Sequence, residues 1–337
     1  MINPTLTGIG LTMVAGVMSG NCMLPMKYAR RWRPENVWFV FSIVSLLVLP
    51  WALAFAVVPQ LLEVYRILPI RAMLAPFLFG AGWGIAQVLF GISVRRLGMS
   101  VGYAIIVGLG AVLGTLVPLF VGQRALVTNV GLTMILAGVV VMVIGIALTA
   151  WGGKVKEHAT AAGLAAAPQR GYLAAVLLAI LCGVLAPMLN YAFAFGQDLA
   201  EEAVRLGSSP VAAAYAVWPV ALLGGLILNI GYSGFLLQRN STWTAFGEDV
   251  RDVIWPGLMG VLWMGAFALY GMSAVYLGAL GTSIGWGLFQ IFMIMTATMS
   301  GLLTGEWRGA PRSAMVLLAA GMAGLVGATL LLSFKGR

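Results

Sequence analysis

The sequence predicts an all-α integral membrane protein, with ten transmembrane helices arranged as two inverted five-helix repeats. Three observations lead to this fold class: the composition, the lengths of the apolar runs and a similarity between the two halves of the chain. Of the 337 residues, 61% are hydrophobic and 9% are charged, whereas soluble domains have about 25% charged residues. One or two soluble cores cannot bury that much apolar surface. The composition therefore disfavours a soluble enzyme, a disordered chain and a nucleic-acid-binding protein.

The apolar runs are long enough to cross a bilayer, which takes about 20 residues per helix. The stretch between Asp252 and Glu306 has no charged side chain and is too long for one span, so we predict a turn at Gly278–Gly281. The segment 198–206 is predicted to form a short surface helix with an apolar stripe. The ten predicted spans are 5–25, 37–58, 73–94, 99–121, 129–151, 171–196, 211–236, 253–277, 281–303 and 313–334.

The distribution of basic residues predicts the orientation of these spans. Thirteen of the 19 Lys and Arg residues lie in the odd-numbered connections, including Lys27 and three arginines in the first one. The positive-inside rule places such connections in the cytoplasm. Both termini are then outside, which for a bacterial inner membrane is the periplasm. The first apolar run has no basic segment before it and no small-residue cleavage site after it, so we expect it to stay as the first span.

An internal repeat relates the two halves. Residues Gly80–Gly98 and Gly260–Gly278 match without gaps at 8 of 19 positions, including a Trp, a Gly-x-Ser and a final Leu-Gly. The predicted units are 1–152 and 171–337, joined by a linker at 153–170. Because each unit has five helices, the second copy must be inverted, as in many secondary transporters with a substrate site near the midplane. Duplicated helices also occur in membrane proteins that transport nothing.

Several segments of the first half carry a family resemblance. Leu24-Pro-Met-Lys-Tyr-Ala-Arg-Arg-Trp32, Leu49-Pro-Trp-Ala52 and the run from Phe79 to Gly102 closely resemble the L-rhamnose–proton symporter family. The resemblance is weaker in the second half, where Asn190, Asn229 and the segment 303–307 match. That family belongs to the drug/metabolite transporter superfamily, so the resemblance implies ten helices in two inverted halves. It also implies symport of L-rhamnose, or a related deoxyhexose, with a proton.

The polar residues inside the predicted spans narrow the substrate class. No Asp, Glu, Lys, Arg or His lies well inside a span, whereas a cationic or anionic substrate normally requires a buried opposite charge or a helix terminus. Neutral amides and aromatic faces suit a neutral sugar. Trp83/Gln87 and Trp286/Gln290 each place an indole and an amide on one helical face. These pairs are the first candidates for the sugar site. The alternative is that the Trp residues lie at the lipid interface and the Gln residues bond neighbouring helices.

Five further residues are candidate sugar ligands. Asn21 and Asn190 lie near Pro25 and Pro187, which free backbone groups for new partners. Tyr103, Tyr215 and Trp263 are also candidates, although aromatic side chains in a packed bundle are more often core residues. Asn229 is more simply explained as a hydrogen bond between helices. The complete predicted set of substrate-binding residues is Asn21, Trp83, Gln87, Tyr103, Asn190, Tyr215, Trp263, Trp286 and Gln290.

Energy coupling needs a group that titrates, and the acids nearest to span ends are Asp198 and Glu306. The single histidine, His158, lies in the predicted linker, and two cysteines cannot form a metal cluster. We therefore predict no catalytic residues, no metal and no cofactor. The expected partners are a small neutral sugar, a proton and the lipid bilayer, with the chain as a monomer or homodimer. Alternatives left open are a facilitator or exporter of another neutral metabolite, and a non-transporting membrane component.

Overall fold

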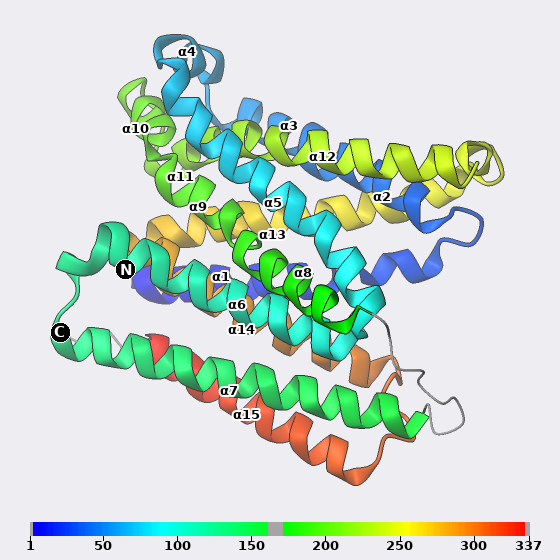
Figure 1. Ribbon diagram of the computed structural model, residues 1–337. Helices are drawn as coiled ribbons and strands as arrows, with labels where there is room; N and C mark the ends of the chain where they lie inside the picture. The colour runs from blue at the N-terminus through cyan, green and yellow to red at the C-terminus, as the bar shows by residue number, and fades with distance from the viewer. Residues whose placement is uncertain (1–2, 161–170, 334–337) are drawn as a thin grey trace.

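The computed structural model describes residues 3–160 and 171–333, and these form a bundle of helices without any strand (Figure 1). The helices of the first half are α1 (Pro4–Asn21), α2 (Pro34–Ile43), α3 (Leu49–Val57), α4 (Leu61–Ile67), α5 (Ile70–Leu97), α6 (Met99–Pro118) and α7 (Asn129–Thr160). Those of the second half are α8 (Tyr172–Leu185), α9 (Met188–Phe195), α10 (Gln197–Arg205), α11 (Pro210–Ala213), α12 (Val217–Arg239), α13 (Ile254–Leu277), α14 (Gly281–Leu303) and α15 (Arg312–Ser333).

Nine segments of the described chain are long and apolar enough to cross a membrane, which confirms a multi-pass membrane protein. Eight of them each overlap one predicted span. The ninth, Val250–Leu303, is 54 residues long and contains both α13 and α14. A 3-10 turn at Gly278–Leu280 separates these two helices, as the sequence predicts.

Proline interrupts several of the predicted spans. Pro187 separates α8 from α9, because a prolyl residue removes one backbone hydrogen bond and its ring clashes with the preceding turn. The second span contains a π-helical turn at Val44–Val48, just before Pro50. The first helix ends at Asn21, and a 3-10 turn around Pro25 follows it.

Several helix boundaries differ from the predicted spans, and two of the differences are instructive. Helix α2 begins at Pro34, three residues before the predicted span, because proline is well suited to the first helical position. Helix α7 continues to Thr160, beyond the predicted end at residue 151, since hydropathy marks where a span ends but not where a helix ends. Residues 161–170 of the predicted linker lie outside the described part of the chain. The predicted surface helix at 198–206 is confirmed as α10.

The helix contacts follow a regular pattern. Helix α1 packs on α13 and α14, while α8 and α9 pack on α5 and α6. Helix α2 contacts α13, α12 contacts α5, and α7 lies along α15 at one side of the bundle (Figure 1). Glycines permit the closest approaches: a Cβ at Gly80 of α5 would lie 1.7 Å from the carbonyl oxygen of Ala221 in α12. Glycines with positive φ, Gly98 and Gly278, end α5 and α13.

The two ends of the bundle are distinct (Figure 1). One end carries both termini of the described chain together with α4 and α10, and we call it the α10 end. The other end carries the connections 22–33, 240–253 and 304–311, and we call it the Glu35 end. These ends correspond to the even-numbered and odd-numbered connections of the predicted topology.

Candidate substrate cavity

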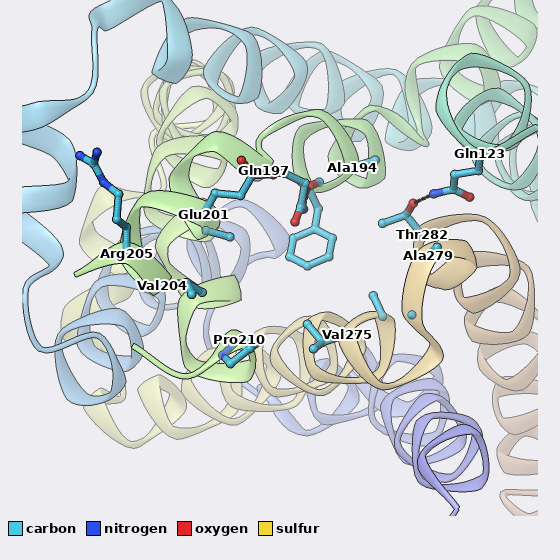
Figure 2. Close-up of a pocket in the computed structure, with 14 residues that line it drawn as sticks. Gln123, Ala194, Gln197, Glu201, Val204, Arg205, Pro210, Val275, Ala279 and Thr282 are labelled. Atoms are coloured by element: carbon cyan, nitrogen blue, oxygen red, sulfur yellow. Dashed lines mark hydrogen bonds between the residues drawn. The ribbon is translucent and has the colours of Figure 1, made fainter. Parts of the chain in front are cut away.

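A cavity of about 650 Å³ opens at the α10 end, between α9 and α10 on one side and the adjoining ends of α13 and α14 on the other. Figure 2 shows Gln197 and Glu201 on one wall and Gln123 with Thr282 across from them. The Nε2 group of Gln123 donates to Thr282 Oγ1 at 2.7 Å. Phe193 contributes an aromatic ring to the lining. The volume lies within the range of about 300–1,000 Å³ that is usual for small-molecule sites.

The amphipathic sequence of α10 explains why its polar residues reach this cavity. Leu199 and Ala203 are fully buried on the side of α10 that packs into the core. Gln197 and Glu201 are four residues apart, so they share another face of the helix, and this face lines the cavity. Arg205 follows at the rim, where its Nη2 donates to Glu202 at 2.7 Å.

Beneath the cavity, a buried hydrogen-bond network joins four helices. The side-chain amide of Asn190 donates to the carbonyl oxygens of Gly114 and Thr282, both at 2.9 Å. Its oxygen accepts a hydrogen bond from the hydroxyl of Tyr270. The neighbouring Trp286 donates from Nε1 to the carbonyl oxygen of Gly110 at 3.0 Å. We call Asn190, Tyr270 and Trp286 the floor network.

Helical spacing places this network directly below the cavity wall. Asn190 precedes the lining residue Phe193 by three positions on α9, Tyr270 precedes Ala274 by four on α13, and Trp286 follows Thr282 by four on α14. One turn of each helix, about 5.4 Å, thus separates the lining residue from the network residue.

Deeper in the bundle, aromatic rings form a continuous column. Phe289 lies against Tyr270, with ring centroids 5.4 Å apart, and against Phe267 at 5.5 Å. Phe267 contacts Trp263 at 4.4 Å, and Trp263 in turn contacts Trp83 at 5.3 Å. Trp83 of α5 and Trp263 of α13, which occupy equivalent positions in the sequence repeat, therefore meet near the middle of both helices, with their ring planes tilted by 31°.

The structure brings some of the predicted ligands together and leaves others apart. Asn190, Trp286, Trp263 and Trp83 lie along the path of the floor network and the ring column. Gln290 is buried one turn below Trp286, and Gln87 is half-buried. Within residues 3–160 and 171–333, neither glutamine amide has a hydrogen-bond partner.

The remaining three predicted ligands have other neighbours. Asn21 accepts a hydrogen bond from Ser300 at the end of α14. The hydroxyl of Tyr215 donates to the carbonyl oxygen of Ala268 at 3.4 Å. Tyr103 packs against the separate core cluster built from α6, α7, α14 and α15. None of the nine predicted ligands lines the cavity. Its polar lining residues are not among the predicted ligands: Gln123, Gln197, Glu201, Arg205 and Thr282.

The two predicted proton-coupling acids occupy opposite ends of the molecule. Asp198 is exposed in the first turn of α10. Glu306 forms an ion pair with Lys27, and its carbonyl oxygen accepts from Lys156 at 3.1 Å.

Two more deeply buried acids were missed, and both close the Glu35 end. Glu35 accepts hydrogen bonds from Asn240 and Thr242, each at 2.9 Å. Asp252 accepts from the backbone N–H groups of residues 30, 31 and 32. The sequence contains one indication of the position of Glu35. Pro34 is suited to begin a helix, so Glu35 is expected in the first turn of that helix, at the end of the bundle.

Comparisons with known proteins agree over nearly the whole chain. A family model described as "L-rhamnose-proton symport protein (RhaT)" matches residues 1–334. A protein of Cronobacter sakazakii named L-rhamnose-proton symporter is 30% identical over 331 residues, which is 95% of each chain. Proteins of the same name from Klebsiella pneumoniae and Escherichia coli are 29% and 28% identical over 91% and 95% of each chain. A solved crystal structure, 16% identical, shares the fold with a TM-score of 0.56 over 96% of both chains.

Proposed function

The chain belongs to the L-rhamnose-proton symport protein family, and from this premise we propose that it is a secondary active transporter of a neutral sugar. The substrate is L-rhamnose or a related deoxyhexose, carried with a proton by alternating access. The family and its named relatives are transporters and not enzymes.

The observation that carries this proposal is a largely apolar cavity with a few polar side chains in its walls, open at one end of a bundle whose other end is closed by hydrogen bonds. The cavity ends at the floor network, and the Glu35 end is joined by the hydrogen bonds of Glu35 and Asp252. Access from one side at a time is the basic requirement of alternating access. The amides, hydroxyl and aromatic ring of the cavity suit a solute with many hydroxyl groups.

The proposed architecture is the drug/metabolite transporter fold, with two inverted five-helix repeats at 1–152 and 171–337. The main helix contacts support it, because exchanging the two repeats turns each of these contacts into another observed contact. The packing of α1 on α13 and α14 corresponds to the packing of α8 and α9 on α5 and α6. The contact of α2 with α13 likewise corresponds to that of α12 with α5.

The proposed central sugar site is reached from the cavity once the floor network opens, and it is centred on Trp83, Gln87, Asn190, Trp263, Trp286 and Gln290. Asn21, Tyr103 and Tyr215 have other neighbours in this conformation and stay predicted ligands. The ring column offers flat apolar faces, and Gln87 and Gln290 have amides without protein partners in the described chain. Asn190 holds the floor closed in this conformation, because its amide bonds Gly114, Thr282 and Tyr270. Opening would free that amide for a sugar hydroxyl.

We place the protein in a bacterial inner membrane, as a monomer or homodimer, with both termini and the α10 end on the periplasmic side. The charge distribution of the connections supports this orientation. The cavity then opens toward the side from which a nutrient sugar arrives.

The experiment that tests the function is uptake into proteoliposomes that contain only this chain. We expect labelled L-rhamnose to accumulate against its gradient when the outside is made acidic, and a protonophore to reduce accumulation to equilibration. Counterflow of preloaded sugar should persist with the protonophore. A chain that moves no L-rhamnose, in either assay, is not the proposed transporter.

Proton coupling is proposed to use Asp198 or Glu306. We expect Asp198→Asn to retain sugar counterflow and to lose accumulation driven by the proton gradient, and Glu306→Gln is the parallel test. Desolvation of the carboxylate in one access state and hydration in the other would supply the coupling. If both variants accumulate sugar like the parent, neither acid carries the proton. If the parent itself equilibrates sugar without responding to the gradient, it is a facilitator.

A further inference from the structure

The wall of the cavity formed by α10 is rich in hydrogen-bond acceptors that the protein leaves available. Among the described residues Glu201 has no ion-pair partner, although it lines the cavity. Gln197 uses its Nε2 group to donate to the carbonyl oxygen of Phe193 at 2.6 Å. Its Oε1 atom therefore remains as an acceptor beside Glu201 (Figure 2).

The opposite wall and the ring complete a surface for a polyhydroxylated solute. Gln123 and Thr282 bond one another across from α10, and the hydroxyl of Thr282 can still donate while it accepts from Gln123. Phe193 contributes an apolar contact to the lining, and its ring is held in place by stacking on Trp218, with ring centroids 4.9 Å apart. Hydroxyl groups both donate and accept, so a neutral sugar can satisfy both walls.

We propose that this cavity is an entry subsite for a neutral monosaccharide, separate from the central site in the ring column. Gln197 and Glu201 accept hydrogen bonds from the sugar hydroxyl groups, Thr282 donates from the opposite wall, and Phe193 gives an apolar contact to the sugar ring. The inference rests on the proposed function for the identity of the sugar. It adds a first binding position for the sugar, one helical turn above the floor network. The sugar is held there before the hydrogen bond from Asn190 to the carbonyl oxygen of Thr282 breaks.

Protection of an introduced thiol tests whether sugar occupies the cavity. Both natural cysteines, Cys22 and Cys182, are buried, so a hydrophilic maleimide reports on the introduced site. Ala194→Cys places a thiol in the cavity lining, and Gln60→Cys places one on the exposed surface of the same end, outside the lining. We expect L-rhamnose to slow labelling after Ala194→Cys and to leave labelling after Gln60→Cys unchanged.

A second substitution tests whether α10 contacts the sugar. In the Ala194→Cys background, Glu201→Gln should raise the half-protecting concentration of L-rhamnose about tenfold, since hydrogen bonds to charged acceptors are among the stronger ones. The matched control is Glu63→Gln, which neutralises an acid of α4 at the same end but outside the lining. It should leave the half-protecting concentration as it was. Closure around sugar in the central site alone would protect the thiol equally with and without Glu201→Gln.

The outcomes separate this inference from the proposed function. If the parent transports no L-rhamnose, the proposed function fails. If the parent transports L-rhamnose but the sugar does not protect the Ala194→Cys thiol, or protects it equally after Glu201→Gln, the entry subsite is overturned. Protection by sodium chloride without sugar, absent with choline chloride, would also overturn it and identify Glu201 as a cation ligand.

Discussion

The two ends of the bundle join the halves of the chain in different ways. At the Glu35 end, residues 30–36 of the first half are hydrogen-bonded to residues 240–252 of the second, and Lys27 pairs with Glu306. At the α10 end, a cavity of about 650 Å³ lies between α10 and the ends of α13 and α14. There the bond between Gln123 and Thr282 crosses between the halves at the far wall.

The kind of contact at the Glu35 end explains how this end can be closed in one conformation and open in another. The bonds at the Glu35 end are polar and lie at the ends of helices, where water can replace each partner. The net contribution of a hydrogen bond to a charged group is about 1.5–3 kcal/mol, because water bonds the same groups when the end opens. A closed end made of several of them can therefore exchange with an open end at modest free energy, as alternating access requires.

The largest expected effect is on the closed floor of the α10 end. We expect Asn190→Ala to lower the free energy of unfolding by about 2–4 kcal/mol, because two carbonyl groups and the Tyr270 hydroxyl lose their partner together. Thermal unfolding in detergent measures this loss. Tyr270→Phe removes one bond of the same network and should cost only about 1 kcal/mol. Equal stability of Asn190→Ala and the parent would mean that the network does not hold the floor.

The next effect concerns the closure of the Glu35 end. Asp252→Ala should reduce unfolding free energy by about 1–3 kcal/mol, since three backbone N–H groups lose a charged acceptor. It should also increase hydrogen exchange of residues 30–32. Glu248→Ala is the matched control, because this acid of the same connection is exposed. Unchanged exchange at residues 30–32 would show that Asp252 does not close this end.

A third prediction places the central site between the two ends. Gln87→Ala should weaken L-rhamnose binding by about 1–3 kcal/mol, or roughly tenfold to a hundredfold, with unfolding temperature close to that of the parent. The unfolding temperature should stay unchanged because the Gln87 amide has no protein partner in the described chain, so its removal leaves no protein group without a hydrogen bond. Isothermal titration with the sugar measures the change. If Gln87→Ala and the parent bind L-rhamnose with the same affinity, this face of α5 does not form part of the sugar site.

The smallest effect is expected at the exposed ion pair of the Glu35 end. Lys27 and Glu306 have side chains 53% and 46% exposed, and ion pairs in water contribute about 0–1 kcal/mol. Lys27→Gln should therefore shift the unfolding temperature less than Asp252→Ala does, and high salt should reduce the difference from the parent. A shift as large as that of Asp252→Ala would mean that this ion pair contributes as much to closing the end as the Asp252 bonds do.

The apolar pattern of the sequence predicted most of the fold, because each span is a local property of about 20 residues. The turn at Gly278–Leu280 and the amphipathic helix α10 were predicted correctly for the same reason. Helix α4 was missed because it is only seven residues long, too short to show a clear helical period. The start of α2 differs from the predicted span because Glu35 interrupts the apolar pattern, whereas Pro34 already begins the helix.

The cavity could not be predicted, because its lining comes from segments that only tertiary packing brings together. Gln123, Gln197 and Thr282 are separated by at least 70 residues along the chain, and no spacing relates them. The same holds for Glu35 and Asp252, whose partners lie in the other half. The tryptophan pair was accessible to sequence reasoning because the repeat places Trp83 and Trp263 at equivalent positions, and the structure brings them into contact.

The close packing of α7 on α15 has a consequence for the order in which the protein is made. A Cβ at Gly321 would lie 2.8 Å from the carbonyl oxygen of Gly145, so the two helices meet backbone to backbone along a glycine-lined seam. Helices α8 to α14 are synthesised between them. During translation, α7 therefore remains in the lipid without its main partner until nearly the whole chain has been inserted. A chain that ends before α15 would leave the glycine-lined face of α7 without its packing partner.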